Sequence, residues 1–484
     1  MGMDYRGCED EHTVGIWEVD EDRLKSMEHK LSDPPKLLSV AAGRPTCSIF
    51  KVPQTLIEIN GNSYQPHIVS IGPFHHGQPH LRMIEEHKWR FLRQLLNRTQ
   101  TKGMVLKDYL KAVQKLEVEA RECYSETIPY GTDEFVEMMV LDGCFLVELF
   151  RKFNGQTIKF DEFDPLNTMS WVIPFFLRDL IRLENQIPFF VLECLFDLTK
   201  ISGDDDSCST LATLALGFFD FDLQRGTNIL DKYADVKPKH LLDLLRSSFL
   251  PEEIEHSKKP DGRLPSHIIH TISKLRRAGI KLKPGKAESF LVVNFEHGVI
   301  HMPTITIDDF MSTFLLNSVA FEQCHSGCSN HFNTYVTLLD YLINTSKDVG
   351  YLCESNIIEN YLGTDAEVAT FINNIGKDIS FDIDSCYLAQ LFNDVNVYSG
   401  IERHKQWASF RYTYFDTPWS FISALAALIL LVLTVVQTIF TIIDYIHHRG
   451  GFKCEPLFGC EREDSRERDM WRMTRRHVRS MADD

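Results

Sequence analysis

FISALAALILLVLTVVQTIFTII, residues 421–443, is the stretch that decides how this chain is organised. It contains no Asp, Glu, Lys or Arg, and most of its residues are Leu, Ile, Phe or Val. A helix of this length is about 35 Å long, against a bilayer hydrocarbon core of about 30 Å. A buried core helix is the alternative, but such helices seldom run this far without a charge. The stretch therefore predicts a single-pass transmembrane helix, over residues 419–446 with its flanks.

Polar side chains dilute this apolar run without cancelling it. Thr434, Gln437, Thr438 and Thr441 can bond to the backbone of their own helix or to a second helix in the membrane. The sequence therefore predicts contact with the lipid bilayer through Phe421–Ile443 and allows self-association through the span.

The amino-terminal segment bears on where the rest of the chain lies. Residues 1–20 are polar and acidic and lack the apolar core of a signal peptide. We therefore expect the large domain to be cytosolic, with the short tail, residues 447–484, on the other side of a plasma membrane or endomembrane. Basic residues flank the span about equally on both sides, so their count does not decide the orientation.

Composition excludes some classes of function. The formal net charge is −17, which opposes binding to nucleic acid because phosphate contacts need a basic surface. Twelve cysteines lie singly along the chain, as reduced thiols do, and only Cys454 and Cys460 beyond the span are plausible disulfide partners. No cofactor-binding motif is present, and we predict no cofactor.

The remaining sequence predicts a mainly α fold. Residues 1–46 are polar and read as a mobile arm, and residues 47–415 form one helical domain with no visible linker. Two segments apolar on nearly all sides, 135–150 and 171–198, are the expected core. Alternating or short apolar runs predict strands at 48–52 and 67–71 and one hairpin at 290–302. The last predicted helices of the domain cover 308–322, 331–345, 351–362, 365–375 and 385–396.

The common catalytic motifs are missing from the sequence. The candidate catalytic residues are therefore polar residues that stand within apolar stretches. The loop 71–80 carries His75 and His76, and the imidazoles can move protons near neutral pH. Asp142 lies within MMVLDGCF, and Glu184 precedes IPFF. Buried carboxylates suit acid–base chemistry when their pKa is raised, but they also serve as structural ties between helices.

A weak metal candidate follows in CHSGC. Cys324, Cys328 and His331 resemble part of a zinc site, but a closed site needs four ligands. A loop between two helices explains the same residues, and we predict no metal.

Several blocks of sequence carry a family resemblance. IGPFHHG (71–77), MMVLDGCF (138–145), LENQIPFF (183–190), HLLDLLR (240–246) and AFEQC (320–324) occur in this order before the span. The chain thereby resembles the plant family called Domain of Unknown Function 247, also described as UPF0481-type membrane proteins. It departs in Phe74, where Tyr or Leu is common, and in its longer, more charged tail.

The resemblance implies a plant protein with a helical body and one carboxy-terminal membrane helix, and it supplies no agreed reaction. Some grass members are linked to self-incompatibility loci, which favours a recognition role by analogy. Our first hypothesis is a membrane-anchored, non-enzymatic recognition or signalling protein with an unknown protein partner. The alternative is an enzyme with an acid–base pocket between the buried helices, formed by His75, His76, Asp142 and Glu184.

Overall fold

The computed structural model falls into two compact units, residues 1–409 and 410–484. Most of the predicted tail, with Cys454 and Cys460, lies outside the described residues. Those are residues 20–32, 38–39, 41–154, 164–169, 171–200, 210–225, 232–233, 236–250, 269–380, 382–383, 386–401 and 418–449.

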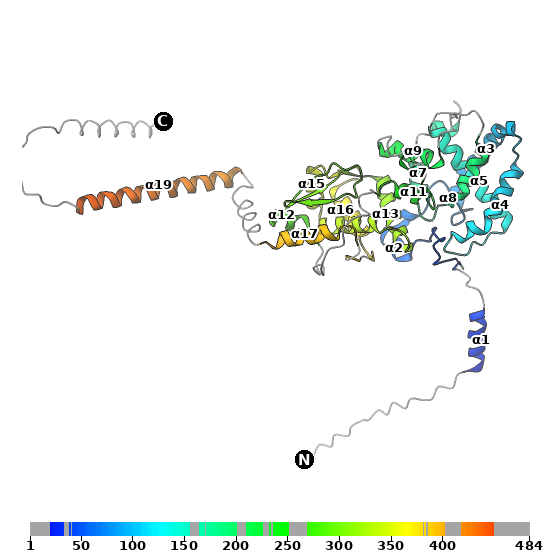
Figure 1. Ribbon diagram of the computed structural model, residues 1–484, viewed down its shortest axis with the longest axis horizontal. Helices are drawn as coiled ribbons and strands as arrows, with labels where there is room; N and C mark the ends of the chain where they lie inside the picture. The colour runs from blue at the N-terminus through cyan, green and yellow to red at the C-terminus, as the bar shows by residue number, and fades with distance from the viewer. Residues whose placement is uncertain are drawn as a thin grey trace, which may run out of the picture. The chain divides into compact units, whose positions relative to one another are not determined.

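Helices dominate the first unit, so the predicted mainly α fold is confirmed (Figure 1). Its central element is α5 (Thr132–Asn154), which is buried along almost its whole length. It packs against α3 (Arg82–Thr99), α4 (Leu106–Glu122), α8 (Phe189–Thr199) and α9 (Leu211–Leu223). A helix with apolar side chains on all faces must be covered on all faces, and these four helices cover α5.

The apolar run 171–198 is divided into two helices. Only one of its two prolines, Pro188, marks the division. α7 (Val172–Asp179) contains Pro174 in its first turn, where the proline's missing N–H breaks no helical hydrogen bond. Pro188 instead stands at the start of α8. Residues 180–188 between them are irregular and carry LENQ, which positions the candidate site described below.

The second half of this unit adds a helical layer built around α13 (Asp309–Cys324). Buried on nearly all sides, α13 packs against α14 (His331–Leu342), α7 and α11 (Leu241–Ser247). α16 (Asp365–Ile375) covers α14 and α15 (Ser346–Glu354). The other helices of these layers are α2 (Gln54–Asn60), η1 (Gly61–Tyr64), η2 (Pro79–Leu81), η3 (Gln100–Lys102), α6 (Pro165–Thr168), α12 (Ile272–Arg277) and α17 (Ala389–Gly400).

The predicted hairpin is present as β2 (Asn294–Glu296) and β3 (Val299–Met302), which pair antiparallel. His297 and Gly298 both have positive φ, the conformation that a tight two-residue turn requires. β1 (Lys281–Pro284) joins the other side of β3 as a parallel strand that the sequence analysis missed.

Three other strand and helix predictions are wrong. Residues 351–362 are not one helix, because α15 ends at Glu354 and β5 (Ile358–Asn360) pairs parallel with β4 (Ile305–Ile307). Residues 48–52 form only an isolated bridge between Ile49 and Tyr124. Residues 67–71 form no strand, and buried side chains bind their backbone groups instead.

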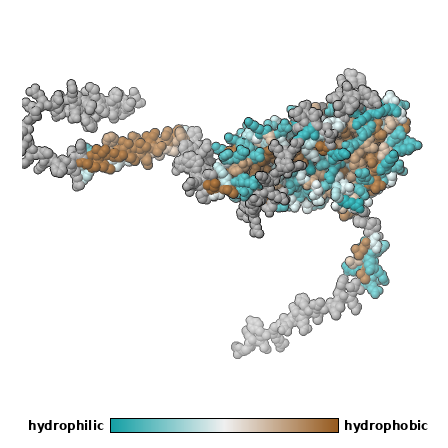
Figure 2. Space-filling view, in the orientation of Figure 1, coloured by the Kyte–Doolittle hydropathy of each residue, from teal (hydrophilic) through white to brown (hydrophobic). Residues whose placement is uncertain are grey.

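Two further helices do not belong to these layers. α1 (Glu21–Ser32) lies within the predicted arm and buries none of its residues. α19 (Pro418–Arg449) contains the segment Phe421–Ile446, which by length and composition is suited to cross a membrane. Figure 2 shows that its side chains form a continuous apolar surface.

Candidate functional site

Residues 66–72 are the centre of the candidate site, because buried side chains bind their backbone N–H groups. Asp179, at the carboxyl end of α7, accepts the backbone N–H groups of His67 at 2.9 Å, Ile68 at 2.8 Å and Val69 at 3.1 Å. Arg182 Nε donates to the same carboxylate at 3.1 Å. Burial acts to raise the pKa of Asp179, but the His67 and Arg182 interactions outweigh it, so the pKa is lowered. Asp179 is thus a charged clamp on the backbone.

Asn185 extends this clamp along the same segment. Its Oδ1 accepts the Ile71 N–H at 2.7 Å, and its Nδ2 donates to the carbonyls of Val69 and Asp179 at 3.1 and 2.9 Å. Gln186 donates to the carbonyls of Leu180 and Arg182, both at 2.8 Å. The polar residues of LENQ therefore satisfy backbone groups that the irregular turn before α8 would otherwise bury without partners.

Asp142 holds the end of the segment. Its Oδ2 accepts the Gly72 N–H at 2.8 Å, and its Oδ1 is paired with the fully buried Lys88. The Lys88 ammonium also donates to Glu85 and to the Ser70 carbonyl. Burial raises the pKa of Asp142, and the Lys88 charge opposes that rise. Asp142 is therefore an ion-paired tie between α5 and α3.

Glu184 and His75 are the two predicted acid–base residues that the structure brings together. His75 Nε2 lies 3.1 Å from Glu184 Oε2, although their relative orientation does not meet hydrogen-bond geometry. The same carboxylate accepts the Lys51 ammonium at 2.9 Å and the Val52 N–H at 2.8 Å. Burial acts to raise the pKa of Glu184, but His75 and Lys51 reverse this and lower it. Gln78 Nε2 lies 3.0 Å from His75 Nδ1.

His76 makes different contacts from its neighbour. Its ring packs edge-on against Tyr130 with centroids 5.5 Å apart, and its carbonyl accepts the Tyr130 hydroxyl at 3.4 Å. The four predicted residues therefore form two separate ties, His75 with Glu184 and Asp142 with Lys88, while His76 packs beside Tyr130. Each carboxylate also accepts at least one backbone N–H.

The weak metal candidates lie in the turn between α13 and α14. Cys328 Sγ donates to the His325 carbonyl at 3.1 Å, and the His331 ring packs on Tyr387 with centroids 4.7 Å apart. Burial raises the pKa of both Cys324 and Cys328 to about 12, so the thiols stay protonated at neutral pH. Among the residues that the structure describes, no group of three or more His, Cys, Asp or Glu side chains is placed to hold a metal ion.

Glu322 is a buried carboxylate that the sequence analysis did not single out, although it lies in the AFEQC block. It accepts the backbone N–H groups of Phe332 at 3.2 Å and Asn333 at 2.8 Å, at the start of α14. Arg246 Nη1 donates to it at 3.1 Å. Burial raises its pKa to about 7, against the opposing charge of Arg246. The sequence offered no local signal for this role, because Glu322 ends the predicted helix 308–322 and the N–H groups that it accepts lie 10 and 11 residues further along the chain.

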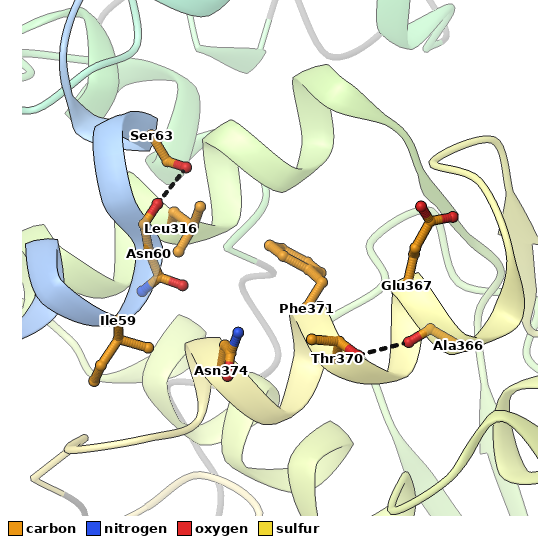
Figure 3. A pocket seen from close by; sticks show the side chains of 9 residues that line it. All are labelled: Ile59, Asn60, Ser63, Leu316, Ala366, Glu367, Thr370, Phe371 and Asn374. Atoms are coloured by element: carbon orange, nitrogen blue, oxygen red, sulfur yellow. Dashed lines mark hydrogen bonds between the residues drawn. The ribbon is translucent and has the colours of Figure 1, made fainter.

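None of the histidines and carboxylates described above lines either of two surface pockets. The first has a volume of about 420 Å³ and opens between α2, η1, α13 and α16 (Figure 3). It is lined by Ile59, Asn60, Ser63, Leu316, Ala366, Glu367, Thr370, Phe371 and Asn374. Ser63 and Thr370 both donate their hydroxyl protons to backbone carbonyls, which leaves an apolar floor with a polar rim. The second pocket, also about 420 Å³, lies between α4 and α8.

Comparisons with known proteins give a family and two relatives. The family model DUF247, described as "Plant protein of unknown function", matches residues 49–433. The chain is 37% identical to "UPF0481 protein At3g47200" of Arabidopsis thaliana, over 87% of this chain and 91% of that protein. It is 25% identical to "Putative UPF0481 protein At3g02645" of the same plant, over 73% and 82% of the two chains. No solved structure matches the chain significantly.

Proposed function

This chain belongs to the DUF247 family of plant proteins of unknown function, and from that premise we propose that it is a membrane-anchored, non-enzymatic recognition or signalling protein. Its helical domain presents a surface to a protein partner, and α19 holds that domain at a lipid bilayer. The analogy with grass members linked to self-incompatibility loci favours recognition.

The observation that carries the proposal is the use of the buried ionisable groups. Asp142, Asp179 and Glu184 each accept backbone N–H groups and each faces a cationic side chain. Neither described pocket is lined by any of them. A general acid or base must reach the substrate proton, within about 3.2 Å or through one water. These carboxylates instead bind backbone N–H groups and cationic side chains of their own chain, and so stabilise the fold.

One contact supports the rival hypothesis of an enzyme. His75 and Glu184 form a carboxylate–imidazole pair 3.1 Å apart, the arrangement by which many enzymes orient a general base. His75 is only 3% exposed, so a substrate would reach it only after the loop 71–78 opened.

A His75→Gln variant separates the two hypotheses in the plant. The comparison needs three lines with matched chain abundance in the membrane fraction: the natural chain, His75→Gln, and a line lacking the chain. We expect the His75→Gln line to keep the natural small-molecule profile and the natural set of cross-linked protein partners. The enzyme hypothesis would be supported instead if the His75→Gln line had the small-molecule profile of the line lacking the chain and kept its partner cross-links.

The anchor also supports self-association, which we propose as a second property of the span. Thr434, Thr438 and Thr441 donate their hydroxyl protons to carbonyls four residues earlier, at 2.7–2.8 Å. Their hydrogen-bonding capacity is thereby largely met within the helix. Gln437 keeps a side-chain amide without a described partner, and an amide in hydrocarbon gains from pairing with a second helix.

Gln437→Leu should lower the energy transfer between two fluorescently labelled chains in vesicles, while Gln406→Leu outside the span should not.

A further inference from the structure

α1 presents an apolar stripe that no described residue covers. Leu24, Met27 and Leu31 recur at the spacing of one helical face, and they are 44%, 57% and 84% exposed. The two edges of the stripe differ in charge, since Glu21 and Glu28 flank one side while Arg23 and Lys30 flank the other.

The pocket between α4 and α8 offers an apolar surface flanked by charged groups. Leu116, Phe190 and Cys194 give it an apolar floor, and Ala112, Lys115 and Glu119 complete its lining. The charge of Lys115 reaches Cys194 from the α4 side, and that of Asp197 reaches it from α8. The α4 wall therefore carries the cation Lys115 beside the anion Glu119, and the α8 wall carries the anion Asp197.

From this match we propose that α1 docks in this groove of its own chain, with its stripe on the apolar floor. The tether supports docking within one chain. Leu38 forms a bridge with Glu126, just beyond the end of α4, and the Ser39 N–H donates to the Ser125 carbonyl at 2.9 Å. The chain steps from Ser32 to Leu38 span at most about 20 Å. Short tethers give effective concentrations in the millimolar range, so a small interface suffices.

The tether also favours one direction of α1. Ser32 lies within reach of the carboxyl end of α4, because Leu38 is fixed there. If α1 runs parallel to α4, with Leu31 towards Glu119 and Leu24 towards Ala112, the tether stays short. The opposite direction would require the tether to run back along α4 from Glu122 to Ala112, a further distance of about 15 Å that uses most of its reach.

Helix handedness then decides which edge of α1 faces which wall. On α4, Tyr109 and Val113 are buried, while Lys111 and Val118 are exposed. When α4 is viewed from solvent with its carboxyl end at the top, its buried face points away from the viewer. Because the helix is right-handed, the residues that line the groove then lie on its right side, where α8 also lies.

An α1 that runs upward in the groove, stripe inward, has its acidic edge on the left and its basic edge on the right. Glu28 therefore faces Lys115 of α4, and Arg23 faces Asp197 of α8. Asp197 already pairs with Lys200 at 2.7 Å, but both groups are exposed, so that pair is weak and can be shared.

Cys194 makes the docking directly measurable in the full-length chain. It is a free, partly exposed thiol in the groove. Met27→Cys lies on the stripe, and His29→Cys lies on the opposite face of α1, so it is the matched control. Under mild oxidation in membranes or detergent, we expect the thiol introduced at position 27 to form a disulfide with Cys194 of the same chain, mapped by peptide mass spectrometry.

Charge variants test the register. Arg23→Glu in the Met27→Cys chain should slow cross-linking several-fold, and adding Asp197→Lys should restore it. Equal cross-linking from positions 27 and 29, or none from position 27, would overturn the proposal. Cross-links found only between two chains would overturn docking within one chain and assign the groove to a second copy.

Discussion

Lys88 illustrates how a single residue in the apolar stripe of α3 supports the fold. Its side chain is 0% exposed, and its ammonium contacts Asp142, Glu85 and the Ser70 carbonyl. The Lys88→Met variant leaves the Asp142 carboxylate buried without its cation, and we expect a loss of about 3–5 kcal/mol in the free energy of unfolding. Urea unfolding of the full-length chain in detergent measures this free energy. The double variant Lys88→Met/Asp142→Asn should be more stable than Lys88→Met alone; equal stability would show that the pair is not coupled.

Gly72 is required by its surroundings as well as by its backbone. Its φ is +77°, and a Cβ there would lie 2.4 Å from the Gln186 carbonyl oxygen. Gly77 has nearly the same φ, +78°, but a Cβ there would meet open space. Gly77→Ala should cost about 1–2 kcal/mol, the strain of the left-handed conformation. Gly72→Ala should cost clearly more in the same unfolding measurement, and equal losses would contradict the close approach to Gln186.

His240 links stability to pH. Its Nδ1 accepts the Asp243 N–H at 3.2 Å as the cap of α11, and its Nε2 lies 3.1 Å from the Ser48 carbonyl. Burial lowers its pKa to about 4, with Lys239 and Arg246 acting in the same direction and Asp243 against it.

Because the folded pKa of His240 lies below the unfolded value of about 6.5, its contribution is complete above pH 6.5 and is lost as the pH falls towards 4. We expect about 2 kcal/mol of this loss by pH 5. His240→Asn, which keeps a neutral cap, should be less stable at pH 7 but lose less stability between pH 7 and 5. An unchanged pH dependence in the variant would show that His240 does not titrate in this range.

At the scale of elements, side chains take the place of a missing strand. The predicted strand 67–71 is largely buried but is not a strand, and its N–H groups bind Asp179 and Asn185. The apolar pattern reports burial of the side chains and contains no information about which group binds the backbone. The burial of this segment was therefore predictable, and its backbone conformation and hydrogen-bond partners were not.

Removing the Asp179 clamp should loosen this element specifically. Asp179→Ala deprives three backbone N–H groups of a charged acceptor, and hydrogen bonds to charged groups contribute about 1.5–3 kcal/mol each. We expect faster amide hydrogen exchange at Ile68 and Val69 and a loss of at least about 3 kcal/mol in stability. Asp309→Ala removes the exposed partner of Arg178 and should change stability by less than about 1 kcal/mol. Unchanged exchange at Ile68 in Asp179→Ala would contradict the clamp.

At the scale of the whole molecule, we propose that α19 holds the chain in a membrane. We expect the full-length chain to stay with membranes after alkaline carbonate extraction. Leu430→Arg with Leu433→Arg should release it, because each arginine at the helix centre costs about 2.5–3.5 kcal/mol of insertion. Val118→Arg with Val397→Arg, at exposed positions of the first unit, should leave membrane retention unchanged. Release of the natural chain by carbonate would contradict the anchor.

The proposed orientation is tested in the same membranes. An amino-terminal tag should be digested by protease added to sealed vesicles, and Asn97, which lies in the glycosylation sequence Asn97-Arg98-Thr99, should carry no glycan. A shielded tag together with a glycan on Asn97 would place the first unit on the luminal side.

The sequence by itself determined the class of fold, the apolar carboxy-terminal helix and the family, because apolar periodicity, length and ordered blocks are properties of neighbouring residues. Only the tertiary structure decided what the polar residues within those blocks do. Lys88 and Asp142, or Lys51 and Glu184, meet across more than fifty residues of chain, and no local pattern encodes such a pairing. Burial makes each of these charges costly unless it is paired, so packing, rather than sequence spacing, selects their partners.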